Sequence, residues 1–153
     1  MDRDVTIRAY VSADRPHVRR IACETAFLGA SREATFGGDE VLADALTLYF
    51  TDYEPGSCFV AESRGEVVGY IIGTLDCAVM DKVFNARVLP VILLKAFSRG
   101  TFLIFSVWRF LFAVSASFLR GEFNAPDFRV DYPAMLHINI DKGFRGAGLG
   151  RRT

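Results

Sequence analysis

The sequence has few of the residues that build disulfide frameworks or metal centres. Its three cysteines, Cys23, Cys58 and Cys77, include no pair with CxxC spacing and cannot all pair with one another. This usage is typical of a reducing compartment, so we expect each cysteine to be a small core residue and the protein to be cytoplasmic. The two histidines, His17 and His137, are isolated in the sequence, and we expect no metal site.

An excess of charge of either sign is also missing. The 18 basic and 18 acidic residues cancel, so no overall field attracts nucleic acid or an anionic membrane, although a local anion site stays open. The N-terminal residues are charged and contain no apolar segment of the kind found in signal peptides, so we expect none. A length of 153 residues fits a single domain with a real core.

The first half of the chain predicts alternating strands and helices. β-Branched alternation predicts a strand at 5–10, and helical spacing of Val18, Ile21, Ala22 and Thr25 predicts a helix after it. A second helix is expected over 39–50, with one apolar side formed by Val41, Leu42, Ala45, Leu46 and Tyr49.

A β-hairpin is expected next, with strands at 58–62 and 67–75. Gly65 in the turn between them suits a positive φ angle. Gly69 and Gly73 within the second strand indicate a bulge or a close approach of another backbone, and simple tight packing is equally consistent with them.

Residues 78–131 form a strongly apolar insertion. We expect two helices broken near Ser98–Gly100, with residues 83–120 forming a homodimer surface or a lid. The alternative is a membrane span over 101–119, whose central Arg109 would cost about 2.5 to 3.5 kcal/mol. A single crossing would place the hairpin and the last strand on opposite sides of the membrane. Because we expect them to share a sheet, we predict no span.

The last stretch combines a strand with a glycine-rich loop. Residues 136–140 predict a buried strand, and four glycines follow within eight positions, interspersed with arginines: Gly143, Gly146, Gly148, Gly150, Arg145, Arg151 and Arg152. Free backbone N–H groups and positive charge suit a phosphate group. No Gly-Lys-Ser/Thr sequence follows the loop, which argues against a nucleotide of the P-loop type.

In this order of elements the chain resembles the N-terminal and central part of the GNAT-type N-acetyltransferase superfamily. The resemblance rests on Arg145-Gly146-Ala147-Gly148-Leu149-Gly150, which match an Arg/Gln-x-x-Gly-x-Gly/Ala loop after a strand, and on the first strand and the hairpin. It covers roughly residues 4–76 and 132–153 and implies an α/β (α+β) fold with a mixed, mostly antiparallel sheet flanked by helices. It also implies a single N-acetyltransferase-like domain over 1–153, with the insertion at 78–131.

The resemblance further implies transfer of an acetyl group from acetyl-CoA to a primary amine by direct attack on the thioester. The acceptor would be a small molecule or a peptide. The pantetheine arm would pair with the strand, and the pyrophosphate would lie on the loop and the next helical turn. The implied cofactor-binding residues are Ile138, Asn139, Ile140, Arg145, Gly146, Ala147, Gly148, Leu149, Gly150 and Arg151.

No catalytic residue can be carried over from the family. Positions where relatives often have Glu or His align with Ala134 and Leu136, which are apolar. His137 falls on the opposite face of the strand, and we interpret it as a packed or hydrogen-bonded structural histidine. The alternative function is therefore a non-catalytic acetyl-CoA-binding or protein-interaction module of the same fold. Relatives continue beyond the loop with further helices and strands, so we expect a domain that is incomplete at its C-terminus.

Overall fold

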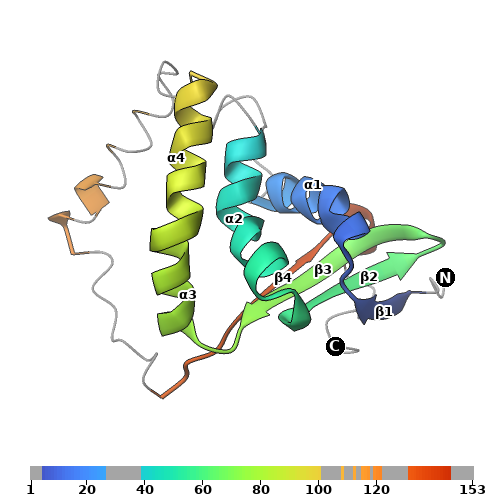
Figure 1. The fold of residues 1–153 in the computed structure, drawn as a ribbon. Helices are drawn as coiled ribbons and strands as arrows, with labels where there is room; N and C mark the ends of the chain where they lie inside the picture. Colours follow the sequence, from blue (N-terminus) through green and yellow to red (C-terminus); the bar gives the residue numbers. More distant parts are fainter. Residues whose placement is uncertain are drawn as a thin grey trace.

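Four antiparallel strands form one sheet in the order β1-β2-β3-β4 (Figure 1). The structure is a computed structural model that describes residues 5–26, 39–100, 108, 112, 115–117, 119–121 and 131–145. The strands are β1 (Thr6–Ala9), β2 (Cys58–Ser63), β3 (Glu66–Thr74) and β4 (Met135–Ile140). Each of the four strands predicted from the sequence is confirmed, with ends that differ by one residue at most sites. The prediction that the last strand is buried was wrong, because β4 lies at the edge of the described sheet and none of its residues is buried.

The β2–β3 hairpin closes as its sequence predicts. Gly65 has a φ of 83° and Arg64 a φ of 52°, and glycine adopts positive φ angles without steric cost. The pairing shifts register where Ala61 lies opposite Gly69 and Glu62 opposite Val67. Val68 is therefore an extra residue on β3, so a bulge lies directly beside Gly69, as this glycine indicated.

Helices pack on one face of the sheet (Figure 1). The first two are α1 (Arg15–Thr25), after the 3₁₀ turn η1 (Ser12–Asp14), and α2 (Asp39–Tyr53), before the 3₁₀ turn η4 (Pro55–Ser57). After β3 come α3 (Cys77–Val83), a π-helical turn η5 (Phe84–Val88) and α4 (Leu89–Ser98), which follow one another without a gap and run beside α2. Asp76 caps α3, because its carboxylate accepts hydrogen bonds from the backbone N–H groups of Ala78 and Val79.

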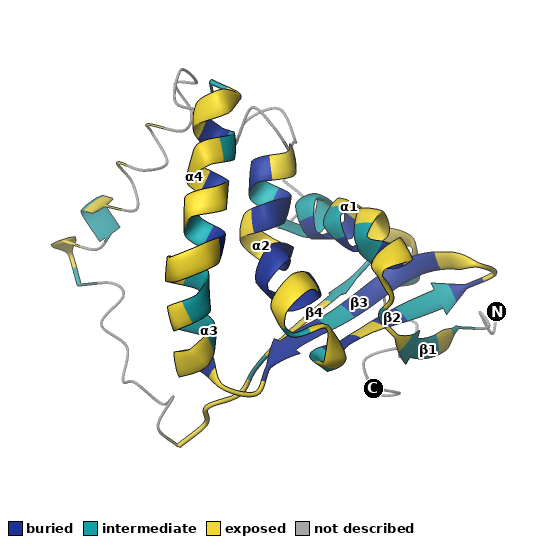
Figure 2. Ribbon diagram, in the orientation of Figure 1, coloured by how far each residue is buried: buried dark blue, intermediate teal, exposed yellow. Residues whose placement is uncertain are grey.

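The core lies between these helices and the sheet (Figure 2). Alternation along each strand directs one set of apolar side chains to the helices. The buried apolar cluster comprises Val18, Ile21, Ala22, Val41, Leu48, Tyr49, Phe50, Cys58, Val60, Val67, Tyr70, Ile72, Val88, Ile92 and Ala96.

The buried side of α2 differs from the predicted one. Ala45 and Leu46 are exposed, while Asp44 and Thr47 are fully buried. The prediction was wrong because α2 packs against α1, the sheet and α4 together, so its buried surface is wider than one apolar stripe. Asp44 can be buried because Arg19 and Lys95 form ion pairs with it.

Part of the apolar insertion lies outside the described residues. α3, η5 and α4 occupy 77–98, and most of 101–119, the segment for which a membrane span is the alternative to soluble helices, is not described. Among the helices in the described part of the chain, none has both the length and the hydrophobicity needed to cross a bilayer.

Candidate functional site

β4 is an edge strand of the described sheet. It pairs only with β3, from Gly69 opposite Ile140 to Thr74 opposite Met135. Strand β4 therefore presents a second edge to which no other described strand is bonded. A free edge of this kind can accept another extended chain through main-chain hydrogen bonds.

The backbone groups on that free edge can be identified from the pairing. The N–H of Asp141 donates to the carbonyl oxygen of Val68 at 2.8 Å. In an antiparallel pair the bonded residues alternate, so the groups of His137 and Asn139 face β3. Those of Leu136, Ile138 and Ile140 point outwards. Of the predicted cofactor-binding residues on this strand, Ile138 and Ile140 therefore offer main-chain groups to a ligand.

Two glycines of β3 bring β4 close. A Cβ atom on Gly73 would lie 2.7 Å from the carbonyl oxygen of Met135, and one on Gly69 would lie 3.1 Å from that of Asn139. The close backbone approach inferred from these glycines is confirmed, because a distance below 3.0 Å requires a neighbour to move.

The C-terminal end of β4 is held by charged side chains. Arg145 donates from Nε to the carbonyl oxygen of Ile140 at 3.1 Å, which is one of the outward-facing groups. Asp141 lies 3.2 Å from the guanidinium of Arg20 on α1 and caps the 3₁₀ turn η8 (Lys142–Phe144). The rest of the predicted phosphate loop, Gly146, Ala147, Gly148, Leu149, Gly150 and Arg151, lies outside the described residues.

The side chains of β4 divide between two faces. Leu136 and Ile138 are exposed on the face away from the helices. Ile138 lies opposite Ile71 of β3, which in turn lies opposite Phe59 of β2. On the helical face, Asn139 donates from Nδ2 to the hydroxyl oxygen of Tyr70 at 2.6 Å. The sequence did not indicate this contact, because it depends on the register between β3 and β4.

His137 lies on the helical face, as strand alternation predicted. It is exposed and lines a pocket with Tyr70 and Asn139. Among the described residues, no side chain or backbone group forms a hydrogen bond with its imidazole. The prediction of a packed or hydrogen-bonded structural histidine was therefore wrong, because β4 is an edge strand of the described sheet and its inner face borders a pocket beside the end of α1 and the middle of α2.

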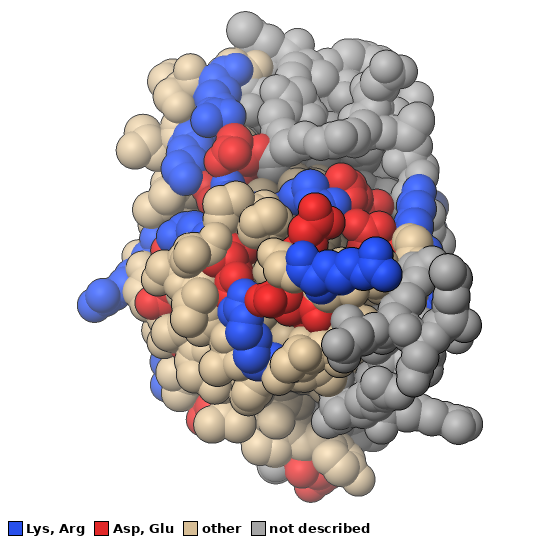
Figure 3. All heavy atoms as spheres, turned by 90° about the vertical axis from the view of Figure 1, so that its right-hand side faces the viewer, with Lys and Arg blue, Asp and Glu red and all other residues tan. Residues whose placement is uncertain are grey.

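A larger pocket of about 470 Å³ lies between α1, α2 and α4. Its walls carry many charges, but its cations already have acidic partners: Arg19 and Lys95 bind Asp44, Arg20 binds Glu24, and Arg15 binds Asp52. On the face shown in Figure 3, basic and acidic side chains are likewise interspersed. Apart from the pair of Arg20 and Glu24, which lies within α1, these pairs join two helices, and we assign no ligand to this pocket.

Two acidic residues near the turns, Glu54 and Glu62, have structural partners and are not free to contact a substrate. Glu62 accepts a hydrogen bond from Arg8 at 2.7 Å. Glu54 accepts hydrogen bonds from Tyr49 at 3.0 Å and from the backbone N–H of Leu75 at 2.9 Å. Among the described residues, no cluster of three or more His, Cys, Asp or Glu side chains could hold a metal ion.

Comparisons with known proteins give a likeness of fold. No protein-family model matches the chain, and no curated protein matches it in sequence. Among solved structures, the chain is similar to the crystal structure of SsHAT, with a TM-score of 0.72 and 23% sequence identity, over 97% of this chain and 72% of that one. The predicted mixed α+β fold with an antiparallel sheet and flanking helices is confirmed, and membership of the GNAT-type superfamily stays a prediction.

Proposed function

We propose that this protein transfers an acetyl group from acetyl-CoA to a primary amine. The observation that carries the proposal is the free edge of β4, which ends at Ile140, where Arg145 contacts the last carbonyl oxygen, and which is followed by the glycine-rich sequence. The name of the structural neighbour, SsHAT, fits an acetyltransferase. A cytoplasmic location is part of the proposal, because Cys23, Cys58 and Cys77 are free thiols.

The residues of the free edge fit the pantetheine arm of acetyl-CoA. This arm is extended and contains amide groups, which match the outward-facing N–H and C=O groups of Leu136 and Ile138. A strand edge that holds the arm fixes the position of the thioester, and positioning of this kind supplies much of the rate of a group transfer. Bound acetyl-CoA supplies the activated acetyl group. The sequence from Arg145 to Arg151 would hold its pyrophosphate.

The proposal is tested by calorimetric titration with acetyl-CoA. Wild-type protein is expected to bind, and Gly148→Glu is expected to lose binding, because a carboxylate in the loop would repel and displace the phosphates. Gly56→Glu is the matched control: Gly56 lies before β2, with no atom within 4 Å of an added Cβ, and it should bind as the wild type does. Absence of binding by the wild-type protein would overturn the proposal.

A non-catalytic acetyl-CoA-binding module is the second candidate. It is favoured by the apolar residues Ala134 and Leu136 at the positions where relatives often have a base. Release of free CoA in the presence of a panel of primary amines separates the two functions. Tight binding of acetyl-CoA without turnover of any amine would support the module.

We also propose that residues 83–120 contribute to a homodimer. The support lies on α4, where Leu93, Leu94 and Phe97 have exposed fractions of 49%, 69% and 77%. Apolar side chains this exposed on one helix are typical of a surface that binds protein.

A further inference from the structure

A pocket of about 220 Å³ lies beside β4 on the helical face of the sheet. It opens between the end of α1, the middle of α2 and the inner faces of β3 and β4. Four of its lining residues are small or apolar, and four polar side chains come from the strands and from α1. The lining residues are Ala22, Thr25, Ala26, Leu46, Tyr70, Ile72, His137 and Asn139.

The polar side chains of the pocket differ in whether they already have hydrogen-bond partners within the protein. Tyr70 accepts the hydrogen bond of Asn139, and burial raises the pKa of Tyr70 to about 12, so the phenol remains protonated and neutral at physiological pH. Thr25 bonds the carbonyl oxygens of Ile21 and Ala22 within its own helix. His137 is the exposed ionisable group of the pocket, and its imidazole can exchange a proton with a ligand.

The position of His137 along β4 connects the pocket to the free edge. His137 lies between Leu136 and Ile138, whose backbone groups point away from β3. A molecule paired with those groups would therefore run past the base of the His137 side chain. The pocket opens on the same segment of the strand, from the helical side.

We infer that this pocket receives the acceptor amine and that His137 takes its proton, an inference that rests on the proposed acetyl transfer. The ammonium group of the acceptor gives one proton to the imidazole. The freed nitrogen lone pair then attacks the carbonyl carbon of the acetyl thioester, so that an N–C bond forms and the C–S bond breaks. The leaving thiolate takes a proton from water, and the second proton of the amine nitrogen passes to solvent.

The lining also indicates the class of acceptor. None of the described residues in the wall is acidic, so the pocket offers no carboxylate to a second or third positive charge. Its volume and its apolar wall fit a short aliphatic group. The acceptor is therefore a single primary amine on a small apolar stem, and polyamines are poor substrates.

Few charges surround His137. Tyr70 faces it from β3, and Cys23 of α1 is close enough to Tyr70 to affect the pKa of its phenol. At the end of β4, Arg20 of α1 is paired with both Glu24 and Asp141, and Asp44 of α2 is paired with Arg19 and Lys95.

The test compares His137→Gln with His17→Gln, which changes the other histidine, an exposed residue of α1 outside the pocket. With isobutylamine as acceptor, His137→Gln should reduce kcat/KM by about 10²-fold or more and remove the acidic limb of the pH profile. His137→Gln should leave acetyl-CoA binding unchanged in calorimetry. His17→Gln should change neither the kinetics nor the binding of acetyl-CoA. If the wild type acetylates isobutylamine and His137→Gln does so with the same rate and pH profile, the inference alone is overturned. If the wild type does not bind acetyl-CoA, the proposed function is overturned.

A second measurement tests the pocket without turnover. Isobutylamine should shift the imidazole NMR signals of His137, and spermidine should do so more weakly. Ala26→Leu, which fills the pocket, should abolish the shift and raise KM. Ala45→Leu, on the exposed side of α2, should change neither. No shift in the wild type, or an equal shift in Ala26→Leu, would place the amine elsewhere and overturn the inference.

Discussion

At the residue scale, Asp44 is a buried carboxylate with two cationic partners. It is completely buried on α2, and it accepts hydrogen bonds from Arg19 of α1 and from Lys95 of α4. Burial alone would raise the pKa of Asp44, but the two cations outweigh it and lower the pKa below its ordinary value. One carboxylate thus joins three helices.

Replacing Asp44 by Asn should destabilise the protein by about 3 kcal/mol at pH 7, because two cations would lose their common partner. The folded-state pKa of Asp44 is depressed, so its contribution is present above the unfolded value of about 3.9 and is lost as the pH falls through the folded value. Urea unfolding at pH 7 and pH 3 measures this loss of the free energy of unfolding. Asp52→Asn breaks the more exposed pair with Arg15 and should cost less than about 1 kcal/mol. Equal losses in the two variants would contradict the assignment.

The thiol of Cys58 should be inert in the folded protein. Cys58 is buried, and burial raises its pKa to about 11, so almost none of it is thiolate at neutral pH. Brief treatment with iodoacetamide at pH 7.5 followed by peptide mass analysis should find Cys58 unmodified unless urea is added. Modification without urea, faster than global unfolding, would show that this part of the core opens locally.

At the element scale, the β3–β4 pairing decides whether a site exists at all. β4 is far from β3 in the sequence, with the whole apolar insertion between them, and among the described strands it pairs with β3 alone. The missing side chains of Gly69 and Gly73 allow its backbone to approach. The free edge, the Tyr70–Asn139 hydrogen bond and the exposure of His137 all depend on this pairing.

Gly73→Ala should loosen β4. The added Cβ would lie 2.7 Å from the carbonyl oxygen of Met135, and relieving such a clash typically costs about 1 to 3 kcal/mol. Hydrogen exchange should become faster for the amides of His137 and Asn139, which face β3. Gly56→Ala, where an added Cβ meets no atom within 4 Å, should leave the exchange of β4 unchanged. Unaltered protection of β4 in Gly73→Ala would show that the strand tolerates a shift at this position.

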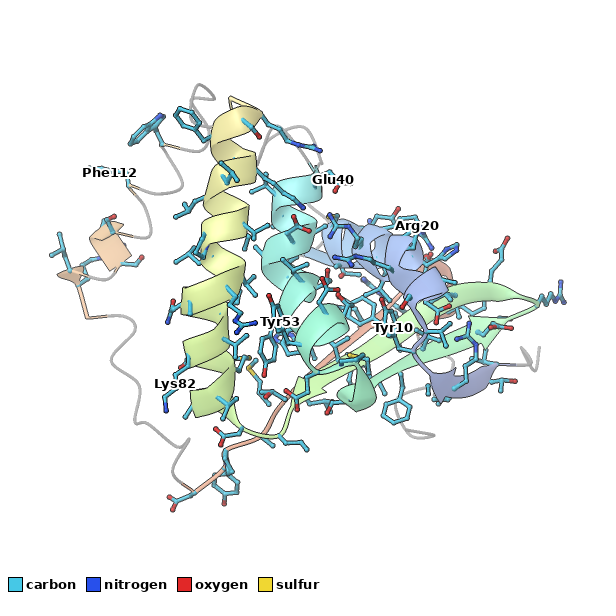
Figure 4. All side chains as sticks on the ribbon, viewed as in Figure 1. Tyr10, Arg20, Glu40, Tyr53, Lys82 and Phe112 are labelled. Carbon is cyan, nitrogen blue, oxygen red and sulfur yellow. The ribbon has the colours of Figure 1, made fainter. Side chains whose placement is uncertain are left out.

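At the scale of the whole molecule, the apolar surface is uneven. α1 and α2 cover the sheet, whereas α4 packs against α2 and keeps apolar side chains on its outer side (Figure 2). Lys82 on α3 also projects away from the sheet (Figure 4). The described part of the chain therefore exposes apolar side chains on α4 and also on β4, where Leu136 and Ile138 lie on the face away from the helices.

Replacing both Leu94 and Phe97 by Glu should shift the protein from dimer to monomer. Each new carboxylate would have to be buried at the proposed interface, where an unpaired charge is strongly unfavourable. Sedimentation velocity over a range of protein concentrations measures the shift. Tyr132→Glu, at another exposed aromatic residue, is the control and should remain dimeric. A monomeric wild-type protein would refute the dimer and leave the proposed acetyl transfer untouched.

The sequence by itself determined the local elements and the fold class. Period-two and helical patterns located the strands and the first two helices, and glycine predicted both the hairpin turn and the close approach at Gly73. These features could be predicted because each depends on residues near one another in the chain. The resemblance carried by Arg145 to Gly150 supplied the expectation of acetyl-CoA, which the described residues do not test.

Only the tertiary structure decided what the side chains do. Asp44 looked like a polar residue beside an apolar stripe, and it became buried because Arg19 and Lys95 arrive from two other helices. His137 was expected to be packed or hydrogen-bonded, and it is exposed because its strand lies at the edge of the sheet. Tyr70 meets Asn139 through a register that no local pattern encodes. In each case the partner is distant in sequence, and its position is fixed by packing across the whole sheet.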